Sequence, residues 1–301
     1  MFLGSKDFGL SCLKTLYQIA PDSLVGAITY DDSGDTRTAL GEFRSFSQET
    51  GLQLKIAETS SHAERLVCEQ SPDLCLVSGW YWLISEQTLA KLPRGFLGFH
   101  NSLLPRYRGA APLVWAMING DTVAGTSLFS FNQGIDDGPL WGQTSLKIEP
   151  TDYIADVTAK LSESATRLLE EKWLSILSGT AVAIEQDESQ ATYAALRKPE
   201  DGQIDWTWPA QKIHNFIRAQ SKPYPGAFAR MPDGRKVTIW RADCPTTPFM
   251  GTPGQVAQIN KDNVYVMGGD HRPLVLQEIA VDGVDLPQPN NLLDSLKIRL
   301  H

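Results

Sequence analysis

The stretch DLCLVSGWYWLISEQTLAKLPRGFLGFHNSLLPRYRGAAP, residues 73–112, holds two short apolar runs with a candidate helix between them. The runs are DLCLVS (73–78) and GFLGF (95–99), and each has the length and apolar content of a buried strand. The candidate helix lies near residues 85–92. A strand, a helix and a second strand in this order form one unit of a largely parallel sheet.

The same alternation extends to both sides of this stretch. Further strands are expected at LVGAITY (24–30), LQLKI (53–57) and GTSLFSF (125–131). Further helices are expected near residues 8–19, 37–51, 60–71 and 112–119. This order predicts an α/β fold with a doubly wound, Rossmann-like parallel sheet, which binds ligands at the carboxyl ends of its strands. Only Met1–Leu3 precede the turn at Gly4, so the sequence leaves open whether the first strand is complete.

The second half of the chain changes in character after a long helix predicted over roughly 151–177. Residues 186–204 are polar and typical of a linker, and another helix is predicted to begin near Pro209. Short β segments follow at AFARM (227–231), KVTIW (236–240), GQVAQI (254–259), NVYVM (263–267) and PLVLQEI (273–279). We therefore expect a catalytic domain over 1–185, a linker over 186–204, and a smaller C-terminal β-rich domain, barrel-like (OB-like), over 205–301.

Composition narrows the choice of partners. The chain has 301 residues, 42% of them hydrophobic, which suffices for a sizeable core and favours two domains over one. We expect a cytoplasmic protein that does not enter a membrane, because there is no long apolar run and no signal-like start. Four scattered cysteines indicate neither a disulfide framework nor a metal site. A net charge of −8 disfavours nucleic acid as a partner without excluding it, since phosphate binding needs clustered Lys and Arg.

Several common catalytic motifs are missing from the sequence. There is no G-x-G-x-x-G after the first strand, no G-x-x-x-x-G-K-[ST] and no G-x-S-x-G. The dinucleotide cradle, the nucleoside triphosphate cradle and the activated serine of many hydrolases are therefore not predicted.

His100 directly follows the run GFLGF, so it is expected at the ligand-binding edge of the sheet. A histidine there acts as a general acid or as a charged donor to a developing negative oxygen. The alternative is a buried histidine that holds a backbone carbonyl group.

A second polar cluster, NQGIDDGPLWGQ (132–143), follows the strand GTSLFSF. Asp136 and Asp137 lie there in a turn bracketed by Gly134 and Gly138, although Asp-Asp-Gly is also common in ordinary turns. Loops that follow neighbouring strands lie side by side, so a carboxylate is expected beside the imidazole of His100. That carboxylate would favour the protonated imidazole and accept a proton.

The segment SGWYWLI (78–84) ends another strand at the same edge. Trp80, Tyr81 and Trp82 provide flat apolar walls for a heterocyclic ligand, or they pack against the helix that follows.

The motifs HNSLLPRYRGAAP (100–112) and GIDDG (134–138) resemble those of the folate-dependent formyltransferases. That family includes methionyl-tRNA formyltransferase, the amino-sugar formyltransferases and the hydrolase domain of formyltetrahydrofolate dehydrogenase. IDWTWPAQKIHNFIRA (204–219) also resembles the start of the family's C-terminal domain.

The resemblance implies transfer of a formyl group from 10-formyltetrahydrofolate to an amine, with no metal. His100 would stabilise the negative oxygen, and Asp136 would keep His100 charged and help to move the proton of the amine. The resemblance also implies folate contacts at Trp82, Leu83, Ile84, Ser102, Leu103, Leu104, Pro105, Asn132, Gln133, Gly134 and Ile135.

One position departs from the family pattern. The transferases carry an asparagine two residues before the histidine, where this chain has Gly98. Loss of one oxyanion donor predicts a transfer slower by about 10²–10³-fold. The hydrolase-type relatives also lack this asparagine, so hydrolysis of 10-formyltetrahydrofolate stays open.

The acceptor is less clearly indicated than the donor. Asn101, Arg106 and Arg108 would contact an acidic acceptor or the folate glutamate tail, unless the arginines brace the loop. The acidic segment YDDSGDTRTAL (30–40) disfavours methionyl-tRNA and favours a small amine, such as that of a nucleotide-linked amino sugar. A non-catalytic folate-binding protein is the remaining alternative, and the sequence leaves open whether the chain forms a homodimer.

Overall fold

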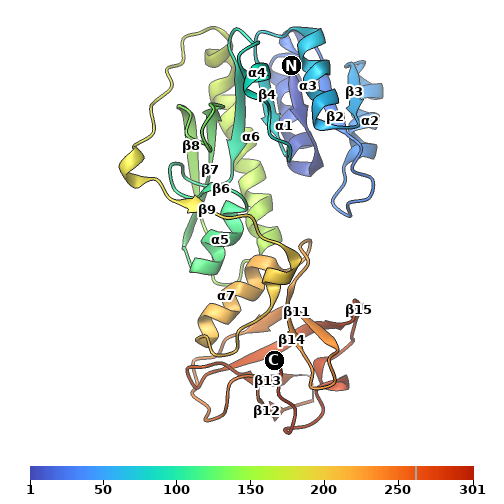
Figure 1. The fold of residues 1–301 in the computed structure, drawn as a ribbon, viewed down its shortest axis with the longest axis vertical. Helices are drawn as coiled ribbons and strands as arrows, with labels where there is room; N and C mark the ends of the chain where they lie inside the picture. The colour runs from blue at the N-terminus through green and yellow to red at the C-terminus, as the bar shows by residue number, and fades with distance from the viewer. Residues whose placement is uncertain (262) are drawn as a thin grey trace. The chain divides into compact units, whose positions relative to one another are not determined.

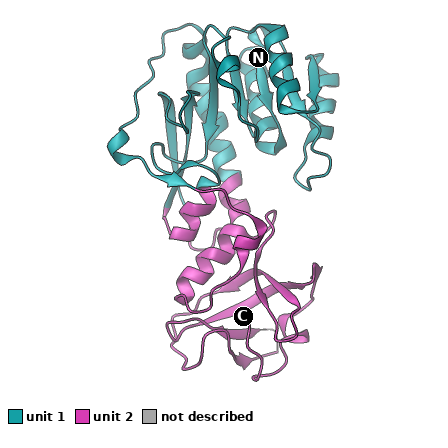
Figure 2. Ribbon diagram, viewed as in Figure 1, with its two compact units in different colours: residues 1–112, 123–147, 159–194 teal, residues 113–122, 148–158, 195–301 magenta. Residues whose placement is uncertain are grey.

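The computed structural model describes residues 1–261 and 263–301, which form two compact units (Figure 2). The first unit comprises residues 1–112, 123–147 and 159–194, and the second comprises residues 113–122, 148–158 and 195–301. The segment predicted as a linker, 186–204, is divided between the two units at residue 194. The functional limits proposed from the sequence, 1–185 and 205–301, stay a prediction. None of the helices in the described part of the chain is long and apolar enough to span a bilayer.

The first unit is built on a seven-stranded sheet with the order β3-β2-β1-β4-β5-β7-β8 (Figure 1). Its strands are β1 (Phe2–Gly4), β2 (Ala27–Tyr30), β3 (Leu54–Ala57), β4 (Cys75–Ser78), β5 (Phe96–His100), β7 (Val123–Ser130) and β8 (Leu140–Lys147). The first five run parallel to one another, which confirms the predicted Rossmann-like arrangement. The sheet is nevertheless mixed, because β7 runs antiparallel to β5 and β8 runs antiparallel to β7.

Helices connect these strands, with bounds close to those expected. They are α1 (Lys6–Ile19), α2 (Leu40–Thr50), α3 (Ser60–Gln70), α4 (Glu86–Leu89), α5 (Pro112–Asn119) and α6 (Ile154–Leu177). Short 3₁₀ turns lie at Pro21–Ser23, Glu188–Gln190, Pro199–Gly202 and Pro289–Asn291. Two further short strands, β6 (Arg108–Gly109) and β9 (Tyr193–Ala194), pair in parallel with each other.

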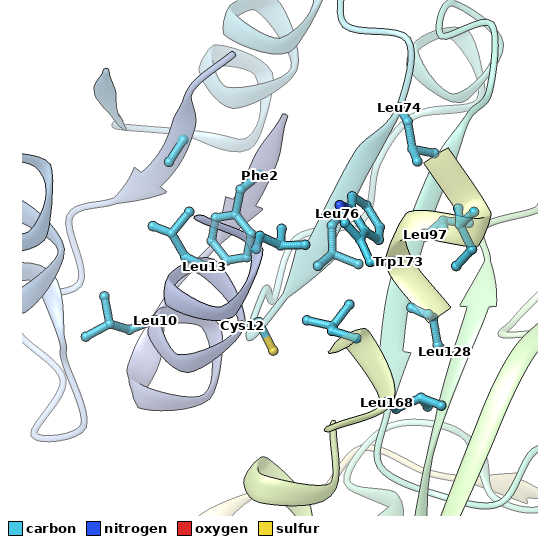
Figure 3. Close-up of a cluster of buried hydrophobic side chains, with 14 of the residues drawn as sticks. Phe2, Leu10, Cys12, Leu13, Leu74, Leu76, Leu97, Leu128, Leu168 and Trp173 are labelled. Atoms are coloured by element: carbon cyan, nitrogen blue, oxygen red, sulfur yellow. The ribbon is translucent and has the colours of Figure 1, made fainter. Parts of the chain in front are cut away.

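Alternate side chains of the central strands supply two separate hydrophobic clusters. Phe2 of β1 and Leu76 of β4 join Leu13 of α1 and Trp173 of α6 in one cluster (Figure 3). Their chain neighbours, Leu3 and Val77 among them, join α3 in the other cluster. Since successive side chains of a strand point to opposite faces, the sheet is apolar on both faces, as a doubly wound fold requires.

The second unit contains a separate antiparallel sheet with the order β10-β11-β14-β13-β12, and β15 pairs with β14. Its elements are α7 (Ala210–Gln220), β10 (Ala227–Arg230), β11 (Lys236–Asp243), β12 (Val256–Ile259), β13 (Val264–Met267), β14 (Pro273–Val281) and β15 (Val284–Asp285). All five predicted β segments are strands, so the expectation of a β-rich C-terminal domain is confirmed. The buried side chains of α7 include Ile213, Phe216 and Ile217.

Candidate active site

The last residue of β5, His100, lies near the carboxylate of Asp136. The distance from His100 Nδ1 to Asp136 Oδ2 is 3.4 Å, and the His100 side chain is 9% exposed. The other ring nitrogen, Nε2, lies 2.7 Å from the backbone carbonyl of Tyr107. Both imidazole nitrogens therefore face an oxygen acceptor, and a protonated imidazole can donate to each of them. His100 thus contacts a backbone carbonyl group, as one interpretation of the sequence held, and it also has the expected carboxylate beside it.

The route by which Asp136 reaches His100 differs from the predicted one. We expected two loops at the same edge of a parallel sheet, but β7 is antiparallel and its last residue, Ser130, pairs with Leu97. The turn after β7 must therefore extend about 10 Å along β5 to reach His100, at about 3.3 Å for each residue. Asp136 takes a positive φ of 50° in that turn, and its Oδ2 accepts a hydrogen bond from the backbone N–H of Gly109 at 2.8 Å.

The neighbouring aspartate has a different environment. The carboxylate of Asp137 lies close to Gly134. A Cβ added at residue 134 would lie 1.9 Å from Asp137 Oδ2. A side chain at position 134 would require the Asp137 carboxylate to move. Asp137 Oδ1 is buried and has no hydrogen-bond partner among the described residues. The structure thus presents Asp136, and not Asp137, to the imidazole.

Gly98 precedes His100 by two residues, so the two side-chain positions share one face of β5. A Cβ at Gly98 would lie 2.3 and 2.5 Å from carbons of the Phe131 ring. The ring of Phe131 thus fills the space that an asparagine would need, and an apolar wall replaces an amide donor.

The predicted folate contacts differ in exposure, and four of them are half-buried: Trp82, Ile84, Leu103 and Pro105. Residues 132–135 are exposed, and the apolar side chains of Ile135 and Leu83 are exposed by 61% and 92%. By contrast, Ser102 and Leu104 are buried, and the hydroxyl of Ser102 donates to the carbonyl of Arg106 at 2.6 Å. The exposed group provides free surface for a ligand, whereas Ser102 and Leu104 can only support the wall behind it.

Trp82 and its neighbours form an aromatic cluster at the end of β4. The ring of Trp82 lies 4.8 Å from that of Tyr30 and 5.2 Å from that of Trp80, measured between ring centroids. A shallow depression adjoins this loop, and Trp80, Leu83 and Ile84 line it together with residues of β1, α3 and β5. Neither His100 nor Asp136 is among the residues that line this depression.

Arg108 is not available to an acceptor substrate, which corrects its prediction as a substrate contact. Its side chain is 1% exposed and forms an ion pair with Glu188 at 2.5 Å. All of its N–H groups point to protein oxygens, on Gln186, Glu188 and the Tyr193 hydroxyl. Arg108 therefore braces the loop after His100, as the alternative interpretation held, through the side chains of Gln186, Glu188 and Tyr193.

The other two predicted acceptor contacts are less enclosed. Arg106 is exposed, and its guanidinium lies 5.4 Å from the centre of the Tyr107 ring. Asn101 is half-buried, and its Oδ1 accepts from the Thr126 hydroxyl at 3.5 Å.

Residues 186–194 were missed by the sequence analysis. Three residues of this segment contact the loop after His100. Gln186 and Glu188 accept hydrogen bonds from the Arg108 side chain. The hydroxyl of Thr192 accepts from the backbone N–H of Tyr107, and its carbonyl accepts from the backbone N–H of Arg108. A polar stretch without apolar periodicity gives no signal for such contacts, which form between residues about 80 positions apart.

The acidic segment after β2 is less negative than its sequence indicates. The ammonium group of Lys6, whose side chain is 10% exposed, pairs with Asp32 at 2.5 Å and Asp35 at 2.9 Å. Arg37 also pairs with Asp35, and hydrogen bonds from Arg37 and then Lys6 hold the pKa of the Asp35 carboxyl well below its usual range. The charge argument against tRNA is correspondingly weaker in the structure.

Comparison with known families fits this geometry. Residues 42–172 match the family described as "Formyl transferase", and residues 197–295 match the one described as "Formyl transferase, C-terminal domain". The chain belongs to the folate-dependent formyltransferase family. This formyltransferase is therefore a formyl-transferring enzyme whose donor co-substrate is 10-formyltetrahydrofolate.

Solved structures share the fold of this formyltransferase at low sequence identity. WlaRD, a sugar 3N-formyl transferase crystallised with dTDP and 5-N-formyl-THF, is 16% identical with a TM-score of 0.70, over 95% of this chain and 97% of WlaRD. An N-formyltransferase from Helicobacter canadensis, in complex with folinic acid and dTDP-3-aminofucose, is 16% identical with a TM-score of 0.71, over 92% and 97%. Methionyl-tRNA formyltransferase from Clostridium thermocellum is 22% identical with a TM-score of 0.54, over 72% and 91%.

Proposed function

We propose that this formyltransferase transfers the formyl group of 10-formyltetrahydrofolate to the amine of a small molecule, with a nucleotide-linked amino sugar as the first candidate. The observation that carries the proposal is the approach of Asp136 to His100, at 3.4 Å in a partly open turn. The fold shared with two sugar N-formyltransferases supports the choice of acceptor.

His100 is proposed to act on the formyl oxygen. When the acceptor amine attacks the formyl carbon, that oxygen becomes negative, and one donor to such an oxygen is worth about 2.7–4 kcal/mol. Because both ring nitrogens already face acceptors, the formyl oxygen must displace the Tyr107 carbonyl from Nε2 to receive an N–H, and Asp136 stays beside Nδ1.

Asp136 is proposed to accept the proton of the amine and to pass it on. The new carbon–nitrogen bond leaves a positive charge on the amine, and Asp136 accepts one proton from it. The negative oxygen then re-forms the carbonyl as the bond from the formyl carbon to N10 breaks, and the leaving N10 takes the proton from Asp136. Folate is proposed to lie over the exposed residues 132–135 and the loop that contains Trp82, Leu83 and Ile84.

Hydrolysis is the second candidate, and the packing of Gly98 against Phe131 favours it. This packing removes an amide donor from the face that carries His100. With fewer groups to hold the acceptor and the oxygen, water is a competing nucleophile. A cytoplasmic location is part of the proposal, and the oligomeric state is left open.

A direct assay tests the proposal. The protein is incubated with 10-formyltetrahydrofolate and nucleotide-linked amino sugars, other small amines or methionyl-tRNA, and tetrahydrofolate and formylated products are quantified. We expect a formylated amino sugar, loss of turnover in His100→Ala, and normal turnover in His301→Ala, whose histidine is the exposed last residue. Formate without a formylated amine would identify a hydrolase, formylated methionyl-tRNA would replace the sugar, and a fully active His100→Ala variant would refute the proposed chemistry.

A further inference from the structure

Gln186 lies in the segment predicted as a linker, yet its side chain is enclosed within the first unit, at 9% exposure. Its Nε2 donates to the backbone carbonyls of Asp136 at 2.8 Å and Gly138 at 2.7 Å. Its Oε1 accepts from Nε and Nη2 of Arg108, at 3.1 and 2.9 Å. A glutamine amide has two N–H donors and one oxygen with two lone pairs, so these four bonds use its full capacity.

The two carbonyls that Gln186 binds belong to the turn that carries the Asp136 carboxylate. Asp136 is a non-glycine residue at a φ of 50°, a left-handed backbone conformation that is held in place by its surroundings. Gln186 holds the turn at Asp136 itself and again two residues later. This contact fixes the direction in which the Asp136 side chain leaves the backbone.

The other side of the Gln186 amide is joined to the loop after His100. Arg108, which donates to Gln186, lies between two residues that contact the proposed catalytic pair. The carbonyl of Tyr107 lies 2.7 Å from His100 Nε2, and the N–H of Gly109 donates to Asp136 Oδ2 at 2.8 Å. One amide thus connects the loop that holds the imidazole with the turn that supplies the carboxylate.

Glu188 anchors this connection from the same segment. Its carboxylate accepts hydrogen bonds from Nη2 and Nη1 of Arg108, at 2.5 and 2.9 Å. The N–H of Nε and the second N–H of Nη2 then donate to Gln186. Because the donors of a planar guanidinium have fixed directions, Arg108 both binds the Gln186 amide and fixes its orientation.

We infer that Gln186 is a positioning residue for formyl transfer, which keeps Asp136 Oδ2 directed at His100 Nδ1 by binding the Asp136 turn and Arg108 together. This inference rests on the roles proposed above for His100 and Asp136. Gln186 contacts neither reacting atoms nor the proposed folate surface, so it acts only through the geometry of the pair. A misplacement of about 1 Å in such a pair lowers the rate by about 10²-fold.

Two substitutions separate the two sides of the amide. Gln186→Met keeps the length of the side chain and removes all four hydrogen bonds. Gln186→Glu keeps an oxygen for Arg108 but has no N–H for the carbonyls of Asp136 and Gly138. The matched control is Gln190→Met in the same segment, because Gln190 is exposed and its amide donates to the hydroxyl of the adjacent Ser189 at 3.4 Å.

The readout is the formation of tetrahydrofolate from 10-formyltetrahydrofolate, which reports transfer and hydrolysis alike. For both Gln186 variants we expect kcat to fall by about 10²-fold. The KM for 10-formyltetrahydrofolate and the Kd of 5-formyltetrahydrofolate should stay within about twofold of wild type, since the folate surface is unchanged. The Gln190→Met variant should match wild type in all three quantities.

Combination with Asp136→Ala distinguishes positioning from general support of the fold. A residue that acts through Asp136 causes no further loss of kcat once that carboxylate is gone, so the effects should not add. A wild-type kcat in Gln186→Glu would overturn the inference. So would a loss of kcat that is as large when Gln186 is substituted in the Asp136→Ala variant as when it is substituted in wild type. If Gln186→Met does not fold, Gln186→Glu decides the matter. An active wild-type protein with unaffected Gln186 variants refutes this inference alone, whereas an inactive wild-type protein refutes the proposed function as well.

Discussion

The aromatic ring of Phe131 occupies the space above Gly98, within 2.5 Å of the position that a Cβ at residue 98 would take. Gly98 lies in β5, and Phe131 directly follows the last residue of the adjacent antiparallel strand β7. The carbonyl of Phe96 accepts a hydrogen bond from the N–H of Phe131. The absence of a side chain at residue 98 and the presence of a large ring at residue 131 are therefore one structural feature. Any test of the missing asparagine must change both residues.

Gly98→Asn alone is expected to destabilise the protein, because overpacking typically costs about 1–3 kcal/mol. Urea denaturation measures this loss. Combining it with Phe131→Ala opens the space, and the amide then lies on the same face as His100. We expect the double variant to recover part of the stability and to exceed wild type in kcat, by at least about tenfold, toward the 10²–10³-fold of one oxyanion donor.

Phe131→Ala by itself serves as the control for this pair. It removes the ring without adding a donor, so its kcat should not rise. A double variant that is stable but no faster than Phe131→Ala would show that an amide at residue 98 does not reach the reacting oxygen.

The two adjacent aspartates are expected to differ sharply in activity assays. Asp136→Asn keeps the shape of the side chain and an oxygen for the Gly109 N–H, but it removes the negative charge beside His100. We expect kcat to fall by about 10²–10⁴-fold, the range of a lost acid–base group. Asp137→Asn should leave kcat within about threefold, since Asp137 faces Gly134 and not the imidazole. Equal losses in the two variants would contradict the assignment of Asp136.

Lys6 is expected to stabilise the first unit through Asp32. The Asp32 side chain is 5% exposed, and Lys6→Met would leave its carboxylate buried without a cation. Breaking a buried ion pair from one side costs about 3–5 kcal/mol. The free energy of unfolding should therefore drop by this amount in Lys6→Met and recover in part in Lys6→Met/Asp32→Asn. Additive losses in a double-mutant cycle would show that the pair contributes no coupling.

The sequence predicted the parts of the fold that depend on local pattern. Five parallel strands and their helices follow from short apolar runs in alternation, and the structure has them close to the expected limits. Strand β8 was not predicted, because LWGQTSLK is an edge strand with no fully buried residue. The direction of β7 was not predicted either, since antiparallel and parallel strands of this length have similar patterns.

The site was predictable where a motif encodes it and unpredictable where it depends on distant contacts. His100 and Asp136 were paired from two motifs, but the geometric reason was wrong, because the turn after β7 begins beside Leu97 and extends along β5 to reach His100. Arg108 lies in the same motif as His100, and its enclosure became visible only with Gln186 and Glu188, which are 78 and 80 residues away. A glutamine in a polar segment carries no signal by itself, since its role depends on which carbonyls the fold brings to it.

The second unit contains a histidine that should make its stability depend on pH. Burial, and then the charge of Arg218, lower the pKa of His214 from 6.5 to about 4, although a hydrogen bond with Ala242 and the charge of Asp243 oppose them. The unfolded chain therefore binds a proton at His214 between these two values while the folded chain does not. Stability is complete above pH 6.5 and falls as the pH is lowered toward 4, by about 3 kcal/mol at about 1.4 kcal/mol for each pH unit.

Thermal denaturation of wild type and His214→Gln between pH 8 and pH 4 checks this dependence. Glutamine does not titrate, so the difference in unfolding free energy between the two proteins should change with pH in favour of the variant below pH 6.5. The acidic residues titrate in both proteins, so their contributions cancel in the difference. His301→Ala is the control, because that histidine is exposed and its removal should leave the pH dependence of the wild type unchanged. Parallel curves for wild type and His214→Gln would show that His214 is protonated as readily in the folded chain as in the unfolded one.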